Sequence, residues 1–235
     1  MRSVTAQRNM QDHKEFLFDS VLKCLSSHYS AEQVIELRGW LLQYKSDVSA
    51  LYSVASLFDN PETSNFEDKG RQILYALESE TLHIRRSEKD VVFPRETALK
   101  AIQIMIDMLD DYLPLGSVVD LRKDLLNQDI PLDKVENIRF VITRRFACAP
   151  NCTAFFPYGG TIYPLSGFDD DKLMYFTPAL VDRVVHTGFA DEAELAYCAF
   201  MKNELVATRG FCSMGFADEE QRKLAGQSVN KAKLG

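Results

Sequence analysis

The spacing of the apolar residues changes near the middle of the chain. Up to about residue 112 they recur every three or four residues, as in Leu17, Val21 and Cys24, which is the period of an amphipathic α-helix. From residue 138 onward, β-branched and aromatic residues dominate, and Ile138 to Phe146 has the composition of a strand. A chain with helices first and strands later is typical of the α+β class.

Six helices are predicted before the change of period. Ser30 with Gln33 three residues later forms the capping-box pattern that starts the second of them. The fifth is apolar almost all round, which indicates a central place in a helical bundle. The predicted helices cover residues 14–28, 30–44, 47–58, 66–82, 94–112 and 118–127.

The later part of the chain predicts a smaller α/β module. Thr153 to Phe156 and Thr161 to Tyr163 flank Pro157-Tyr158-Gly159-Gly160, which reads as a β-hairpin with glycine in its turn. A strand is predicted over Leu173 to Phe176. The pair Thr177-Pro178 then predicts the start of a helix that runs to about His186. The repeated Gly-Phe-Ala-Asp-Glu, at 188–192 and 215–219, predicts that Asp191 and Asp218 cap two further helices.

Composition divides the chain at a similar point. Residues 1–135 carry 16 basic and 22 acidic side chains, whereas the remaining hundred carry 11 and 12. Ten of the fifteen phenylalanines and eight of the eleven glycines lie at or after Phe140. We therefore predict a helical domain over 1–134, an α+β module over 135–223 and a flexible basic tail over 224–235.

The compartment is predicted from the cysteines and from the apolar runs. Five cysteines, an odd number, favour free thiols over a disulfide framework. No apolar run approaches the ~20 residues of a membrane helix. Met1 to Lys14 is polar and does not have the apolar core of a signal peptide. These features predict a soluble, cytoplasmic protein that is not bound to a membrane.

The four late cysteines are the candidate metal ligands. Cys148 and Cys152 lie close together in the sequence, and Cys198, Cys212 or His186 would complete a tetrahedral zinc site. The spacing is not the usual Cys-x-x-Cys, and Cys198 lies in an apolar stretch where a buried free thiol is common. A thiol nucleophile activated by His186, at Cys148 or Cys212, is a further alternative.

Two adjacent basic pairs are the candidate nucleic-acid contacts. These are Arg85-Arg86 and Arg144-Arg145, and the order of elements from Val118 to Tyr163 is compatible with a winged helix that places the second pair against phosphates. Residues 121–135, where the reading helix would lie, have balanced charge, and the formal net charge of the whole chain is −7. Both facts weigh against nucleic-acid binding.

The sequence carries no common catalytic signature, because it contains no P-loop, dinucleotide fingerprint or Gly-x-Ser-x-Gly elbow. We therefore favour a non-catalytic accessory or adaptor subunit that acts through contacts with other protein subunits and needs no cofactor. Phe155, Phe156 and Tyr158 are its candidate interface residues, because aromatic side chains are enriched in interface cores. A nucleic-acid-associated subunit and a zinc- or thiol-dependent protein remain the alternatives.

Overall fold

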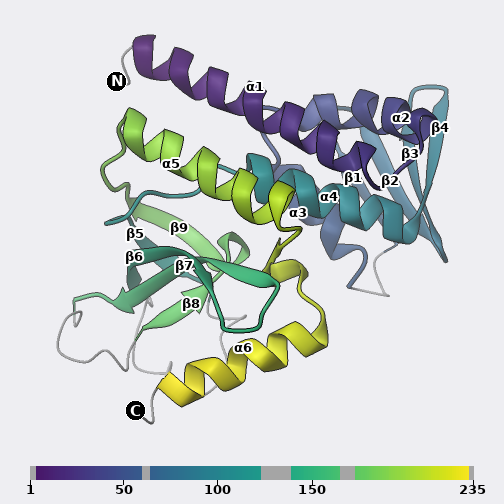
Figure 1. Ribbon diagram of the computed structural model, residues 1–235. Coiled ribbons are helices and arrows are strands. Elements are labelled where there is room, and N and C mark those ends of the chain that lie inside the picture. The colour runs from purple at the N-terminus through teal and green to yellow at the C-terminus, as the bar shows by residue number, and fades with distance from the viewer. Residues whose placement is uncertain (1–3, 60–63, 123–138, 165–172, 233–235) are drawn as a thin grey trace. The chain divides into compact units, whose positions relative to one another are not determined.

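The fold is given by a computed structural model that describes residues 4–59, 64–122, 139–164 and 173–232 (Figure 1). These residues form six α-helices and two β-sheets, so the mixed α/β class is confirmed. The chain divides into an N-terminal unit, residues 1–110 with 202–208, and a C-terminal unit, residues 111–201 with 209–235. The domain boundary expected at 134/135 lies outside the described residues. Within the described part, no helix is both long and apolar enough to cross a bilayer.

The N-terminal unit contains four of the predicted helices. Its helical segments are α1 (Val4–Ser26), α2 (Ala31–Leu41), the 3₁₀ turn η1 (Leu42–Tyr44), α3 (Ser49–Ser56), α4 (Arg95–Leu109) and the π-helical η6 (Asn203–Thr208). The capping box is formed, since the Ser30 hydroxyl accepts the Gln33 N–H while the Gln33 side chain accepts the Ser30 N–H. Helix α4 packs against α1, α3, η6, β3 and β4. Buried positions all round α4 fit the central place that its sequence predicts.

The fourth predicted helix is wrong. Residues 66–82 belong instead to a four-stranded antiparallel meander in the order β1-β2-β3-β4. Its strands are β1 (Asn65–Asp68), β2 (Ile73–Glu78), β3 (Thr81–Arg86) and β4 (Lys89–Pro94). One face of the meander is buried and apolar, with Ile73 and Tyr75 on β2 and Leu82 and Ile84 on β3. The N-terminal unit is therefore a helical layer joined to a small sheet rather than a pure helical bundle.

The C-terminal unit is built on a sheet of order β10-β7-β6-β5-β9, with β8 paired to β7. The predicted strands over 138–146 and 173–176 are confirmed as β6 and β8. Residues 118–121, expected to begin a helix, form β5, and most of the rest of that predicted helix lies outside the described residues. The strands are β5 (Val118–Leu121), β6 (Arg139–Cys148), β7 (Ala154–Ile162), β8 (Met174–Phe176), β9 (Val181–His186) and β10 (Cys212–Ser213).

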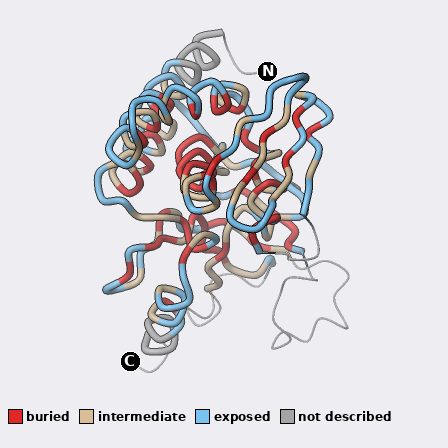
Figure 2. The backbone as a smooth tube through the Cα atoms, turned by 90° about the vertical axis from the view of Figure 1, so that its right-hand side faces the viewer, coloured by how far each residue is buried: buried red, intermediate tan, exposed pale blue. Residues whose placement is uncertain are grey.

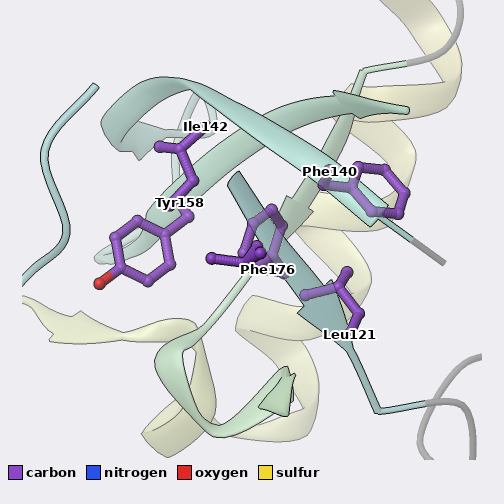
Figure 3. Close-up of a cluster of buried hydrophobic side chains, with 6 residues drawn as sticks. Leu121, Phe140, Ile142, Tyr158 and Phe176 are labelled. Carbon is purple, nitrogen blue, oxygen red and sulfur yellow. The ribbon is translucent and has the colours of Figure 1, made fainter. Parts of the chain in front are cut away.

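An aromatic core holds this sheet together. Side chains from four different strands gather in one buried cluster (Figure 3). Its members are Val119, Leu121, Phe140, Ile142, Tyr158 and Phe176. The Phe140 and Phe176 rings lie 6.1 Å apart, and the Tyr158 ring lies 5.4 Å from that of Phe176. Figure 2 marks the buried positions of the chain in red.

The predicted hairpin turn at Pro157–Gly160 is wrong, because these residues lie inside the continuous strand β7. The two glycines serve close packing rather than a turn. A Cβ at Gly160 would lie 2.6 Å from the Val141 carbonyl oxygen, and a Cβ at Gly159 would lie 3.0 Å from the Tyr175 ring. The wing that a winged helix requires is therefore not formed at this position.

The segments after β8 differ in part from the prediction. Thr177-Pro178 starts only a 3₁₀ turn, η5 (Pro178–Leu180), and the chain then enters strand β9 instead of a long helix. The two predicted caps are confirmed, since Asp191 Oδ1 accepts the Glu194 N–H at the start of α5 (Glu192–Lys202) and Asp218 Oδ1 accepts the Gln221 N–H at the start of α6. Helix α6 (Glu219–Ala232) extends into residues 224–235, for which we expected a flexible tail.

A buried carboxylate links three strands of this sheet and gives a testable pH dependence. Asp120 on β5 accepts hydrogen bonds from Arg139 on β6, at 2.8 Å, and from Arg183 on β9, at 2.6 Å. The hydrogen bond from Arg139, aided by that from Arg183, outweighs burial and holds the pKa of Asp120 below its ordinary value. The carboxylate therefore stabilises the fold at pH values above its ordinary pKa, and this contribution is lost as the pH falls through the lowered pKa.

We expect Asp120→Asn to lower the free energy of unfolding by about 2 kcal/mol at neutral pH, since charge-assisted hydrogen bonds are lost. The difference from the parent should shrink in acid, where the parent carboxylate is itself protonated. Urea unfolding at neutral pH and at a pH below the lowered pKa of Asp120 measures this difference in stability. The exposed Asp182→Asn is the control. An equal difference at both pH values would contradict the role of the charge.

Candidate functional site

The first basic pair is divided between the two faces of the meander. Arg85 is bound on the outer face, where its guanidinium contacts Asp90 at 3.1 Å and Glu78 at 3.0 Å. Successive side chains of a strand point to opposite faces, so Arg86 lies on the other face, where it lines a groove. The two arginines therefore do not form one phosphate-binding surface.

The second basic pair is divided as well. The Arg145 side chain is only 3% exposed, and its Nη2 lies 2.5 Å from a Glu194 carboxylate oxygen on α5. Its Nη1 donates to the Cys198 sulfur at 2.8 Å. Arg144 is exposed and donates to the Tyr175 hydroxyl at 3.2 Å. Arg145 is thus a structural residue that links the sheet to α5, and only Arg144 faces solvent.

The four late cysteines are not arranged as a metal site. Among the described residues, no group of three or more His, Cys, Asp or Glu side chains could hold a metal ion. Cys152 is buried in a cluster against which Cys212 packs, whereas the Cys198 sulfur accepts a hydrogen bond from Arg145. Burial raises the pKa of Cys148, which opposes a reactive thiolate there. His186, the other residue considered, is exposed on β9.

The predicted interface aromatics lie mostly inside the C-terminal unit. Phe155 and Tyr158 are buried, and Phe156 is half-buried against the Tyr175 ring at 5.3 Å. The Tyr158 hydroxyl accepts the Leu113 N–H at 2.8 Å. The first two therefore stabilise the sheet rather than present a free surface.

A groove in the N-terminal unit is a candidate binding site. It is an open hollow of about 700 Å³ between α2 and strands β2, β3 and β4, a volume within the range of ligand-binding sites. Apolar and charged residues line it, Asp90 with atoms other than those bound to Arg85 on the outer face. The apolar ones are Ile35, Trp40, Ile73, Ile84 and Val91, and the charged ones are Glu36, Arg86, Glu88, Lys89 and Asp90.

One apolar lining residue extends far into solvent. Ile35 on α2 is 72% exposed, although most large apolar side chains of this helix, such as Leu37 and Leu41, are buried. Trp40, five residues further along α2, also lines the groove and is only 7% exposed. The groove therefore combines an exposed apolar side chain with a nearly buried aromatic one.

A buried network of polar side chains fixes Trp40. Its indole N–H donates to the Tyr75 hydroxyl at 2.9 Å, and the Tyr75 and Tyr44 hydroxyls form a hydrogen bond. Tyr44 donates in turn to Asp68 at 3.0 Å, and Arg71 binds the same carboxylate oxygen at 3.0 Å. Because these groups are bonded to one another, the indole is preorganised in the groove.

The pKa values agree with this network. Burial raises the pKa of Tyr75 to about 12 and raises that of Tyr44 further, so both phenols are neutral at physiological pH. Burial alone would raise the pKa of Asp68, but hydrogen bonds from Arg71 and Tyr44 outweigh it and lower that pKa. Asp68 is therefore a carboxylate that accepts from both partners.

The sequence prediction missed most residues of this groove. Ile35 lies off the helix face that carries the buried Leu37 and Leu41, and this misfit is the signal that the sequence offers. The lining residues of β3 and β4 were not assigned to strands, so their place opposite α2 was hidden. Of the predicted site residues, only Arg86 lines the groove.

Comparison with known proteins gives one similarity. Residues 112–197 match the model of a family described as a domain of unknown function, DUF4176. The matched stretch lies in the C-terminal unit, from just before β5 into α5, and the groove lies outside it. No curated protein and no solved structure matches the chain.

Proposed function

We propose that the protein is a non-catalytic adaptor whose N-terminal unit binds an apolar peptide segment of a partner protein in the groove between α2 and β2–β4. The observation that carries the proposal is the pairing of the exposed Ile35 with the fixed, nearly buried Trp40. Tryptophan is enriched at the centres of interfaces, and an exposed apolar rim beside a pocket is typical of a docking surface.

The distribution of polar groups supports a peptide rather than a small metabolite. Small-ligand sites are mostly enclosed, with a few polar groups placed to orient the ligand. Here the apolar surface continues outward to Ile35, and charged side chains of α2, β3 and β4 are exposed along the lining. Such an open surface matches a partner that extends beyond the hollow.

The charged residues of the groove lining indicate which kind of charged side chain the partner carries next to its apolar ones. Arg86 and Lys89 are cross-strand partners at the end of the β3–β4 hairpin, and both line the groove. Like charges directly opposite each other are unfavourable. Glu36 and Glu88 also line the groove, so the argument applies to this hairpin end and not to the groove as a whole. An acidic side chain of the partner placed beside Arg86 and Lys89 would relieve their repulsion, so the proposed segment is apolar with one Asp or Glu at that end.

Selection of short random peptides on the purified protein tests this function. Trp40 is the only tryptophan of the chain, so its fluorescence reports directly on the occupied groove. We expect selected peptides to change that fluorescence, and Ile35→Glu to weaken their binding by about tenfold or more, because a charge replaces an apolar contact.

The matched control is Leu42→Glu, which places the same charge at a 45% exposed leucine that does not line the groove. It should bind the peptides as the parent does. Selected peptides that bind both variants equally, or a selection that yields no binder, would overturn the proposal.

A further inference from the structure

We infer that the bound segment is an added β-strand, paired along the free edge of β4, which rests on the function proposed above. Strand β4 is the last strand of the meander, and among the described residues it pairs with β3 alone. Residues of β4, namely Lys89, Asp90 and Val91, also line the groove. The groove and an open strand edge thus belong to the same surface.

The hydrogen-bond pattern shows which groups the edge offers. Arg95 N–H donates to the Glu80 carbonyl at 2.8 Å, immediately beyond the Thr81–Pro94 pair. In an antiparallel ladder, hydrogen-bonded pairs alternate with pairs that are not hydrogen-bonded. The β3–β4 pairs at Phe93, Val91 and Lys89 are therefore the hydrogen-bonded ones.

It follows that the peptide groups of Asp90 and Val92 point away from β3. Both residues are exposed, Val92 by 44%, and no described residue hydrogen-bonds to their N–H or C=O groups at this edge. An edge strand with free peptide groups is the template used in β-strand addition. Pro94 has no N–H to offer, so the available edge is short and lies beside the groove.

This arrangement defines the partner segment more closely. Along an added strand every second side chain lies on the same face, so alternate side chains would enter the groove beside Val91 and Ile84. Arg86 and Lys89 lie at the hairpin end of the same face. The segment is therefore extended, with apolar residues at alternate positions and an acidic residue at the end nearest the hairpin.

Backbone N-methylation of a peptide selected on the groove tests the inference without altering the fold of the protein. Each residue of the peptide is methylated in turn, and affinity is measured by Trp40 fluorescence. We expect affinity to fall by about tenfold or more at every second position, since those N–H groups bind β4, and to change little at the residues between.

A charge-reversal experiment tests the acidic contact. Replacing both Arg86 and Lys89 by glutamate should weaken binding of the peptide, and exchanging its acidic residue for lysine should restore binding to that variant. The exposed Arg38→Glu, on α2 but outside the groove lining, is the control.

The outcomes separate the inference from the proposed function. One outcome is a peptide whose binding depends on Ile35, but whose apolar contacts lie three and four residues apart and whose response to N-methylation does not alternate. Such a peptide binds as a helix, and this result overturns the added strand but not the proposed function. A library that yields no binder sensitive to Ile35→Glu overturns the proposed function.

Discussion

Glutamate at position 145 is expected to unfold the C-terminal unit, whereas glutamate at position 144 is expected to leave it folded. The Arg145 guanidinium is almost fully buried between the Glu194 carboxylate and the Cys198 sulfur. Breaking a buried ion pair costs about 3–5 kcal/mol, and Arg145→Glu adds repulsion from Glu194. This loss approaches the whole stability of many domains, which is about 5–15 kcal/mol.

Arg144→Glu is the matched control, since it is the neighbouring residue with the same change of charge. It loses only an exposed contact with Tyr175, and we expect an effect of about 0.5 kcal/mol or less. Circular dichroism in urea gives the stability, and amide hydrogen exchange read by mass spectrometry locates the change to residues of the C-terminal unit. Equal stability of the two variants would show that Arg145 is solvated and would return it to the candidates for phosphate contact.

Asp68→Ala is expected to lower the free energy of unfolding by about 3 kcal/mol, because it removes the acceptor shared by Tyr44 and Arg71. Asp68 is 6% exposed, so water does not readily replace the lost carboxylate. The network that ends at Trp40 loses its anion, and the groove should lose part of its preorganisation. Urea unfolding followed by the fluorescence of Trp40 measures both the stability and the indole environment.

Asp47→Asn is the control for this prediction, because Asp47 also binds Arg71, at 3.4 Å, but from an exposed position, and asparagine keeps the oxygen that accepts the Ser49 N–H. Exposed ion pairs contribute about 0–1 kcal/mol, so its effect should be much smaller. If the two variants were equally stable, the buried network would not be what holds the groove.

The helices could be predicted from the sequence because their apolar spacing and caps are local signals. The meander was missed for a physical reason that is visible at its turns. Gln72, Ser79 and Ser87 adopt positive φ angles of 54°, 50° and 52° without being glycine. Such positions usually carry Gly or Asn, and in the turns at Ser79 and Ser87 neither is present; only the β1–β2 turn contains a glycine, Gly70. The alternation of Leu82 with Ile84 was the signal that remained.

The glycines of β7 led to the opposite error, because they predicted a turn where the structure has a strand. Gly159-Gly160 resembles a turn in sequence, yet both residues lie in a strand where Tyr175 and the Val141 carbonyl approach closely. The demand for glycine here comes from neighbouring strands that are distant in sequence. Burial of Arg145 beside Glu194 is likewise a long-range contact, so the sequence alone could not separate it from the exposed Arg144.

The groove could be predicted only in part. Its α2 side belongs to a helix that the sequence predicts, and Ile35 stands out there as an apolar residue off the face of Leu37 and Leu41. Its other side depends on the β2–β4 register, which pairs Arg86 with Lys89 and places Ile84 opposite Val91. A docking surface that a helix and several strands form together can be recognised only when the tertiary fold is known.

The most direct test of peptide binding in the groove is to map a groove-selected peptide on the protein by amide proton–nitrogen NMR. We expect shift changes on α2 and on β3 and β4, including the Asp90 and Val92 amides, and a change at the Trp40 indole. The same changes should disappear in Ile35→Glu and persist in Leu42→Glu. Shift changes confined to residues 112–197, with α2 and β4 unaffected, would contradict peptide binding in the groove.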